Sequence, residues 1–199
     1  LGDVYKRQGW AEQNPEEWWS AVCRAVRETL EKGKVNPGEI AGIGIDGQSW
    51  SAIPMDKNGE VLTNTPIWMD TRAADICEEV GREVGEDRIF DVCGNPFKPS
   101  YTTPKILWYK KYLPDVYKKT YKVLQSNSFI AYKLTGEYTQ ELSQGYGLHC
   151  FDMRRGTWDM DMCRELGIEP GMLPDIFPCH QVVAVSYTHL RAHETSLHL

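Results

Sequence analysis

The sequence predicts an α/β domain in which a mixed sheet is flanked by helices. A segment with helical spacing of apolar residues precedes a short apolar run, and a hairpin signal then joins two further short runs. Helical and strand-like segments continue to alternate along the rest of the chain. The composition agrees, because 41% hydrophobic residues in a chain of 199 are enough to close a core.

The first predicted helix begins at Asn14, where a capping side chain is followed by proline and by an acid that can bond back to the cap. Apolar residues then recur at helical spacing until Gly33. We expect this stripe to pack on the sheet through Trp19, Val22 and Val26.

Two predicted strand regions follow this helix. Ile40–Ile45 is a short apolar run with two glycines, which suits a buried inner strand with a helix packed close to it. Segments 51–55 and 60–62 flank Asp56-Lys57-Asn58-Gly59, in which Asn-Gly is a hairpin signal.

The second half of the chain contains mostly helical patterns. A strand is predicted over 121–124, and helices are predicted over 71–80, 103–112 and 157–166, with a further helical turn over 114–119. Ser126 or Asn127 is expected to cap another helix, which ends at Thr135-Gly136. No internal repeat or low-complexity linker separates these elements in the sequence.

The charge pattern excludes some classes of partner. The net charge is -6 and no long cluster of Lys and Arg is present, so we expect neither a nucleic acid nor an anionic membrane as partner. The chain has no apolar run long enough to span a bilayer and no leader-like start, which favours a cytoplasmic location.

The cysteine pattern indicates buried free thiols. The six cysteines form no C-x-x-C pair, as expected in a reducing compartment. His149-Cys150 and Cys179-His180 place possible metal ligands side by side, but their spacing matches no established zinc pattern. We therefore expect no metal site.

Polar side chains gather where two predicted strand regions end. Gln48, Ser49 and Trp50 follow the first apolar run, and Trp68 and Asp70 stand at the end of a later one. Open α/β sheets bind ligands beyond the carboxyl ends of their strands, so these side chains predict a site for a small polar, sugar-like ligand.

Each of these residues also has a structural alternative. Trp50 could stack on a sugar and donate one hydrogen bond, or pack in the core. Gln48 could contact the ligand or close its loop, and Trp68 could line the pocket or end a buried strand. Asp70 could bond a sugar hydroxyl, cap the helix that follows, or pair with Arg72.

The two ends of the chain differ from the rest. Asp3–Gln8 reads DVYKRQ and Val185–Thr195 reads VSYTHLRAHET, and both resemble translated sequencing-adapter sequence. We therefore expect residues 1–8 and 186–199 to be artefactual tails.

Five motifs in order carry a resemblance to a known family. They are WAEQNPEEWW at Trp10–Trp19, GIGIDGQSW at Gly42–Trp50, PIWMDTR at Pro66–Arg72, CGNPFKPSYTTPKILW at Cys93–Trp108 and KLTGEY at Lys133–Tyr138. On these residues the sequence resembles the FGGY carbohydrate kinases, particularly their xylulokinase branch. The resemblance implies a ribonuclease H-like fold of the actin-like ATPase type. Residues 9–185 would then form an incomplete N-terminal sugar-binding domain, truncated at both ends.

The resemblance also implies an activity. Such kinases transfer the γ-phosphoryl of ATP to a sugar hydroxyl with the help of Mg²⁺, so ATP and Mg²⁺ are the cofactors expected for the full-length parent. The substrate would be a ketose such as xylulose, or a related polyol. The general-base Asp and the nucleotide-binding domain would follow Val185, so we expect no catalytic or cofactor-binding residue in this chain and no activity from it alone. A homodimer is a possible state of the full-length parent.

The sugar contacts are assigned residue by residue. Gln48, Ser49 and Trp50 correspond to the family's substrate loop, in which xylulokinases usually have Met-His at the last two positions. Trp68 corresponds to a tryptophan at the sugar pocket, and with Asp70 it completes the second contact segment. Ser100 falls where related glycerol kinases place a pocket tyrosine, or it could be a turn residue.

Two other classes of function stay open from the sequence. Asp46 and Asp70 could be the acid and base of a glycoside hydrolase. The chain could also be a sugar-binding module without catalysis. Sequence beyond Val185 would discriminate, because a Gly-rich segment with an Asp and an ATPase-like domain would support the kinase.

Overall fold

The computed structural model describes residues 8–183 of the chain. The predicted artefactual tails, 1–8 and 186–199, lie outside the described residues except for Gln8.

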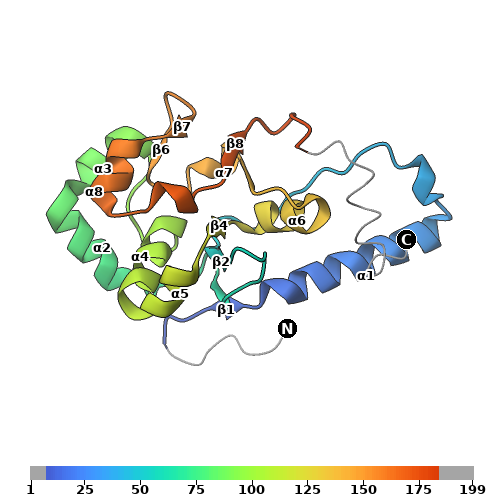
Figure 1. The fold of residues 1–199 in the computed structure, drawn as a ribbon, viewed down its shortest axis with the longest axis horizontal. Coiled ribbons are helices and arrows are strands. Elements are labelled where there is room, and N and C mark those ends of the chain that lie inside the picture. Colours follow the sequence, from blue (N-terminus) through green and yellow to red (C-terminus); the bar gives the residue numbers. More distant parts are fainter. Residues whose placement is uncertain (1–7, 184–199) are drawn as a thin grey trace.

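Most of the helices gather at one end of the described part of the chain, and α1 (Pro15–Gly33) extends toward the other end (Figure 1). The gathered helices are α2 (Ala74–Val80), α3 (Glu86–Cys93), α4 (Thr102–Tyr112), α5 (Pro114–Lys119) and α8 (Met160–Leu166). Helices α6 (Ser126–Thr135) and α7 (Leu142–Gly145) lie between these two ends. None of the helices in residues 8–183 combines the length and apolarity needed to cross a membrane.

The strands are short and pair two by two. The antiparallel pairs are β1 (Glu12–Gln13) with β3 (Thr65–Pro66), β2 (Ile53–Met55) with β4 (Lys122–Leu124), and β6 (Phe151–Asp152) with β7 (Thr157–Trp158). The parallel pair is β5 (Thr139–Glu141) with β8 (Asp175–Phe177). Parallel and antiparallel pairs therefore both occur among the described residues, but in separate two-stranded sheets and not in one mixed sheet.

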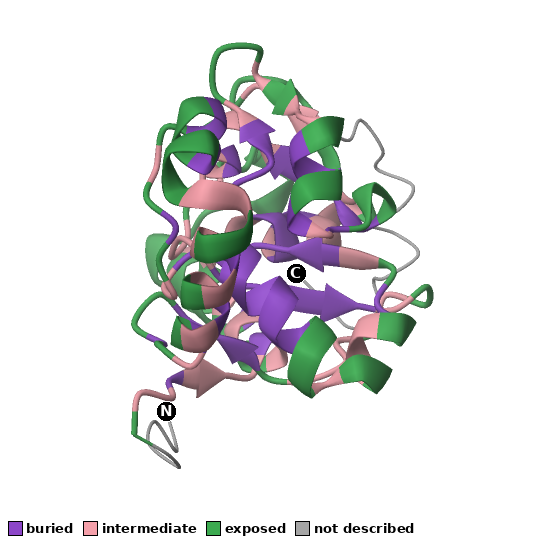
Figure 2. Cartoon of the chain, turned by 90° about the vertical axis from the view of Figure 1, so that its left-hand side faces the viewer, coloured by how far each residue is buried: buried purple, intermediate pink, exposed green. Residues whose placement is uncertain are grey.

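Two apolar clusters form the core. The larger one lies among α2, α3, α4 and α8 and includes Ile76, Ile89, Leu107 and Met162. The smaller one consists of Ile53, Met55, Leu124 and Phe129, and Trp18 and Trp19 of α1 pack against it. Figure 2 shows that buried residues occupy the interior while the outer faces of the helices are exposed. The β2–β4 pair, whose strands come from the first and second halves of the chain, thus contributes residues of both halves to the smaller cluster.

The predicted first helix is confirmed at both ends. Asn14 Oδ1 accepts a hydrogen bond from the Glu16 N–H at 3.0 Å, and Lys34 ends α1 in a left-handed conformation with φ of 53°. The predicted apolar contacts of α1 are only partly correct, because Trp19 is half-buried against the smaller cluster whereas Val26 is 41% exposed.

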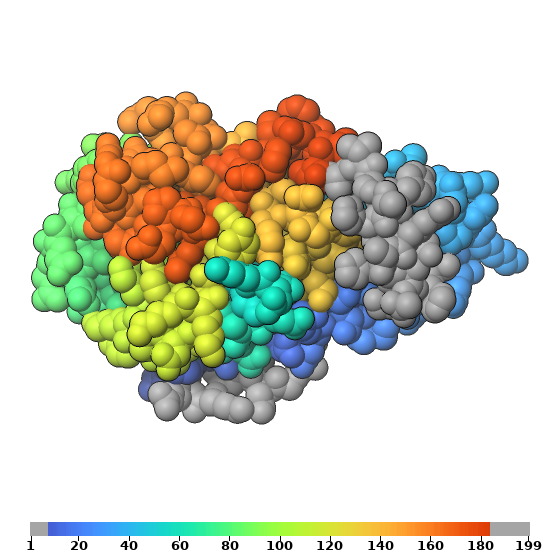
Figure 3. All heavy atoms as spheres, viewed as in Figure 1, coloured from blue at the N-terminus to red at the C-terminus, as the bar shows by residue number. Residues whose placement is uncertain are grey.

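The predicted inner strand at Ile40–Ile45 is wrong. This segment has no regular structure, and Ile40 and Ile43 are 42% and 66% exposed. A strand is stable only when its N–H and C=O groups find a partner, and no described segment pairs with this one. Figure 3 shows the chain after α1 at the same end of the molecule as α1, away from the larger group of helices.

The predicted hairpin is confirmed. Met55 forms an antiparallel bridge with Val61, and the Leu62 N–H donates to the Pro54 carbonyl at 2.9 Å. The carboxylate of Asp56 accepts from backbone N–H groups across the turn, and Gly59 takes the left-handed conformation that the turn requires, with φ of +82°.

Helix boundaries later in the chain follow the prediction with small shifts, and helices α3 and α7 were not predicted. Helix α2 begins at Ala74 rather than Thr71, and the residue that caps α6 is Gln125 rather than Ser126 or Asn127. The predicted helix over 157–166 begins only after Asp159, whose carboxylate accepts from the Met162 N–H at 2.8 Å, because Thr157–Trp158 forms β7.

A pair of glycine substitutions tests the packing of the hairpin on α6. Gly59 and Gly136 have similar left-handed φ values of +82° and +78°, a conformation that costs a residue with a Cβ about 1–2 kcal/mol. A Cβ at Gly59 would also overlap the hydroxyl oxygen of Tyr132, whereas nothing lies within 4 Å of a Cβ at Gly136. We expect Gly59→Ala to lower the free energy of unfolding in urea more than Gly136→Ala does.

The variant Tyr132→Phe separates the cost of the left-handed backbone from the cost of the overlap. Removal of the Tyr132 hydroxyl should restore part of the free energy of unfolding that Gly59→Ala loses. Equal losses in the two alanine variants would contradict the contact between the hairpin and α6.

Candidate functional site

Three segments of the predicted site meet at the first turns of α4. They are the loop that ends at Trp50, the residues around Ile67 at the end of β3, and Ser100 just before the helix. The Nζ of Lys105 donates a hydrogen bond to the backbone carbonyl of each, at 2.7 Å to Trp50, 2.9 Å to Ile67 and 2.5 Å to Ser100. One side chain thus joins the three predicted sugar-contact segments.

Lys105 is fully buried, with 0% of its surface exposed. An ammonium group has three donors and no acceptor, so the three carbonyls use all of its hydrogen-bonding capacity. Burial lowers the pKa of Lys105 to about 7, with Asp70 opposing the fall and Arg72 adding to it. Lys105 was not predicted from the sequence as a site residue. Its signal was a single charged residue between Thr-Thr-Pro and Ile-Leu-Trp-Tyr.

The side chain of Gln48 fixes its own loop. Its Nε2 donates to Gln13 Oε1 at 3.2 Å, and the same oxygen accepts from Trp18 Nε1 at 2.9 Å. The backbone carbonyl of Gln48 accepts from Ser126 Oγ at 2.5 Å. The neighbouring Ser49 is half-buried. These bonds support the loop-closing alternative for Gln48, while its contact with a ligand stays a prediction.

Trp50 sits in an aromatic group. Its backbone is left-handed with φ of 68°, and its N–H donates to Gln125 Oε1 at 3.1 Å. Its indole stacks on Tyr101 with ring centroids 4.4 Å apart and meets Tyr146 edge-on at 6.2 Å. One face of the indole is therefore covered by Tyr101, which limits any stacking of a sugar to the other face.

Buried polar atoms without a hydrogen-bond partner among residues 8–183 occur next to this aromatic group. They include Trp50 Nε1, the adjacent Ser51 Oγ and His149 Nδ1. His149 packs edge-on against Tyr101, and its Nε2 lies 3.1 Å from the Pro96 carbonyl. Because a carbonyl only accepts, Nε2 carries the proton and Nδ1 is a free acceptor. Burial lowers the pKa of His149 to about 4, so the ring is neutral near pH 7.

Trp68 and Asp70 have opposite environments although they are two residues apart. Trp68 is 49% exposed, so its ring is accessible to a ligand. Asp70 is 0% exposed, and its carboxylate accepts from the Ala11 N–H at 2.6 Å and from Arg72 Nη2 at 2.8 Å. Arg72 also bonds Glu12 Oε2 at 2.8 Å. Of the roles considered for Asp70, the ion pair with Arg72 is the one that the structure shows.

Ser100 contributes its backbone to the site. Its carbonyl is bound by Lys105, and its side chain is half-buried. The adjacent Tyr101 supplies the ring that stacks on Trp50. The substrate contact predicted for Ser100 stays a prediction.

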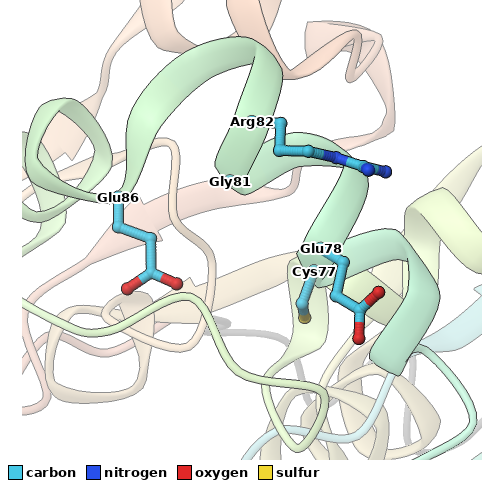
Figure 4. A pocket seen from close by; sticks show the side chains of 5 residues that line it. All are labelled: Cys77, Glu78, Gly81, Arg82 and Glu86. Atoms are coloured by element: carbon cyan, nitrogen blue, oxygen red, sulfur yellow. The ribbon is translucent and has the colours of Figure 1, made fainter.

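A surface pocket elsewhere does not coincide with these segments. It lies where α2 passes into α3, and its lining consists of Cys77, Glu78, Gly81, Arg82 and Glu86 (Figure 4). Burial raises the pKa of Cys77 to about 12, so its thiol stays protonated at neutral pH. None of the predicted site residues lines this pocket.

Comparisons with known proteins agree on one family. The model described as "FGGY family of carbohydrate kinases, N-terminal domain" matches residues 3–194. A xylulose kinase of Bacillus subtilis is 29% identical over 95% of this chain, and a glycerol kinase of Thermococcus gammatolerans is 35% identical over 86% of it. The matched region is 38% and 36% of those relatives, so the chain spans less than two fifths of their length.

The fold is shared with a solved structure. A xyloylose kinase from Brucella ovis superimposes with a TM-score of 0.88 at 25% identity, covering 98% of this chain and 40% of that one. This similarity confirms the predicted fold class, the ribonuclease H-like α/β fold of the actin-like ATPases.

The buried ion pair at Asp70 predicts a large effect on stability. Removal of one partner of a buried pair leaves an uncompensated charge, which costs about 3–5 kcal/mol. Arg72→Met should therefore lower the free energy of unfolding by that amount, and addition of Asp70→Asn should recover part of it. Arg88→Met is the control, because the Arg88–Glu165 pair is 42% and 38% exposed and such pairs contribute about 0–1 kcal/mol. Similar small losses in Arg72→Met and Arg88→Met would contradict the buried pair.

The low pKa of Lys105 predicts that the free energy of unfolding depends on pH. Folded Lys105 releases its proton above about pH 7, whereas a lysine in the unfolded chain keeps it until about pH 10.4. The unfolded state then binds more protons, so the stability of the wild type should rise with pH across this window relative to Lys105→Met. The limiting slope is about 1.4 kcal/mol per pH unit. Urea unfolding of both proteins at several pH values measures this difference, and a flat difference would show that Lys105 keeps an ordinary pKa.

Proposed function

Because this chain belongs to the FGGY family of carbohydrate kinases, we propose that it supplies the sugar-binding part of an ATP-dependent kinase that phosphorylates a ketose such as xylulose, or a related polyol. The observation that supports this best is the convergence of three predicted sugar-contact segments on Lys105. Loops that are far apart in the sequence are thereby held around one place.

The chemistry of that place suits a hydroxyl-rich ligand. Trp50 Nε1 is a donor and His149 Nδ1 an acceptor, and both are buried atoms without a partner among the described residues, so a hydroxyl group that entered beside them would pair with either. Trp68 offers an exposed ring on which the apolar face of a sugar can stack. In the proposed reaction these residues bind and orient the acceptor hydroxyl.

ATP and Mg²⁺ are the cofactors that we propose for the whole protein. Residues 8–183 contain no group of three or more His, Cys, Asp or Glu side chains placed to hold a metal ion. The chain also lacks a Gly-x-x-x-x-Gly-Lys-Ser/Thr loop for phosphates. The described residues therefore do not fit a nucleotide and metal site, and we assign them no step of phosphoryl transfer.

The two other candidate functions have less support. A glycoside hydrolase would need Asp46 and Asp70 to act on one substrate, but Asp46 is exposed whereas Asp70 is fully buried against Arg72. No observation favours a non-catalytic sugar-binding module over a kinase. The cytoplasmic location and the homodimer of the full-length parent stay predictions.

A chimera tests the proposal. We expect residues 9–185, joined to the remaining parts of the Bacillus subtilis xylulose kinase, to release ADP from ATP in the presence of xylulose or of another polyol such as glycerol. In this chimera Trp50→Ala should raise KM more than it lowers kcat, because the ring contributes to binding rather than to charge development. Trp50→Phe is the matched variant, which keeps an aromatic ring but removes the N–H donor and reduces the ring area.

The outcomes separate the candidate functions. A folded chimera without activity on any sugar would contradict the kinase, and cleavage of glycosides would support the hydrolase. Sugar binding by this chain together with an inactive chimera would support the binding module.

A further inference from the structure

We propose that Lys105 is a positioning residue whose ammonium group sets the relative positions of the three sugar-contact segments and thereby the affinity of the site for its sugar. The effect on sugar affinity rests on the proposed function. The coupling of the three segments is argued from the geometry alone.

The three carbonyls that bind Lys105 come from separate parts of the chain, and Lys105 is a side chain that contacts all three. Trp50, Ile67 and Ser100 belong to the loop before β2, the end of β3 and the loop before α4. Each N–H of the ammonium group donates to one segment. If one segment moves, its hydrogen bond breaks while the other two segments still hold the ammonium group in place. The ammonium therefore couples the three segments.

Other side chains of α4 anchor the same region and keep Lys105 in place. Thr102 Oγ1 donates to the Ser51 carbonyl at 3.2 Å, and Tyr109 Oη donates to the Ala52 carbonyl at 2.9 Å. The residue after Trp50 and the next one are thus fixed to α4 independently of Lys105. Loss of the ammonium should for this reason loosen the three segments without detaching the helix.

The three carbonyl oxygens around Lys105 Nζ suit an ammonium group. Because Lys105 is fully buried, loss of its donors would leave these acceptors without hydrogen bonds, which costs about 1–3 kcal/mol of stability for each acceptor. A methionine has a similar length and no donor. An arginine presents a larger planar fork with five donors, which does not match the compact head group of lysine.

Lys110 on the same helix provides a matched control. Its Nζ donates at 2.7 Å to a single carbonyl, that of Gly167, which belongs to none of the three segments. Lys110→Met thus also removes a bond between a lysine of α4 and a backbone carbonyl, but outside the proposed site.

Hydrogen exchange of the chain, followed by mass spectrometry, tests the coupling. In Lys105→Met we expect exchange to accelerate at least about tenfold in all three segments, 47–53, 65–70 and 97–102, which corresponds to about 1.4 kcal/mol of lost protection. Exchange in β5 and β8 should stay unchanged. In Lys110→Met the effect should be confined to the neighbourhood of Gly167. Unchanged exchange in the three segments, or acceleration in one of them alone, would overturn the coupling.

Lys105→Gln extends the test if Lys105→Met does not fold. Its amide retains two donors, so it should show a smaller acceleration in the same three segments. Acceleration spread evenly over the whole chain in Lys105→Gln would show a merely structural role and overturn the proposal.

Titration with xylulose and with glycerol, followed by calorimetry, tests the effect on affinity. We expect Lys105→Met to weaken sugar binding at least about tenfold and Lys110→Met to leave it unchanged. Equal binding by the wild type and Lys105→Met would overturn the inference while the proposed function stands. Absence of binding by the wild type would overturn the affinity half of the inference for this chain, while the activity of the chimera would decide the proposed function and hydrogen exchange would decide the coupling.

Discussion

The arrangement of the candidate site depends on one buried ammonium group. Lys105 is fully buried and gives each of its three donors to a different segment of the chain. A buried charge is costly unless its hydrogen bonds are satisfied, so the carbonyls of Trp50, Ile67 and Ser100 must stay close to one another for the fold to keep Lys105 inside. Because of this constraint, a side chain of α4 links the backbones of three separate segments.

A second buried charge connects the site to the start of the described chain. Asp70 accepts from the Ala11 N–H and pairs with Arg72, which in turn bonds Glu12. The segment after β3 is therefore held against β1, while the adjacent Trp68 remains exposed. Near these segments, the buried atoms Trp50 Nε1 and His149 Nδ1 have no hydrogen-bond partner among the described residues.

Sequence patterns predicted the elements whose stability is local. The cap at Asn14 and the Asn-Gly turn before Glu60 act within a few residues, and both were confirmed. Ile40–Ile45 was predicted as a strand from its apolar residues, but a strand depends on a pairing partner that a local pattern does not reveal. Lys105 was missed for a related reason, because the convergence of three distant carbonyls is a property of the folded chain alone.

The account depends most on the claim that one sugar site lies where the three segments meet. Amide chemical shifts of the labelled chain, measured by NMR during titration with xylulose, test this claim directly. The account predicts that shifts change at Gln48–Ser51, Trp68–Met69 and Ser100–Thr102 with a common binding curve. Changes confined to the pocket between Cys77 and Glu86, or different binding curves for the three segments, would contradict it.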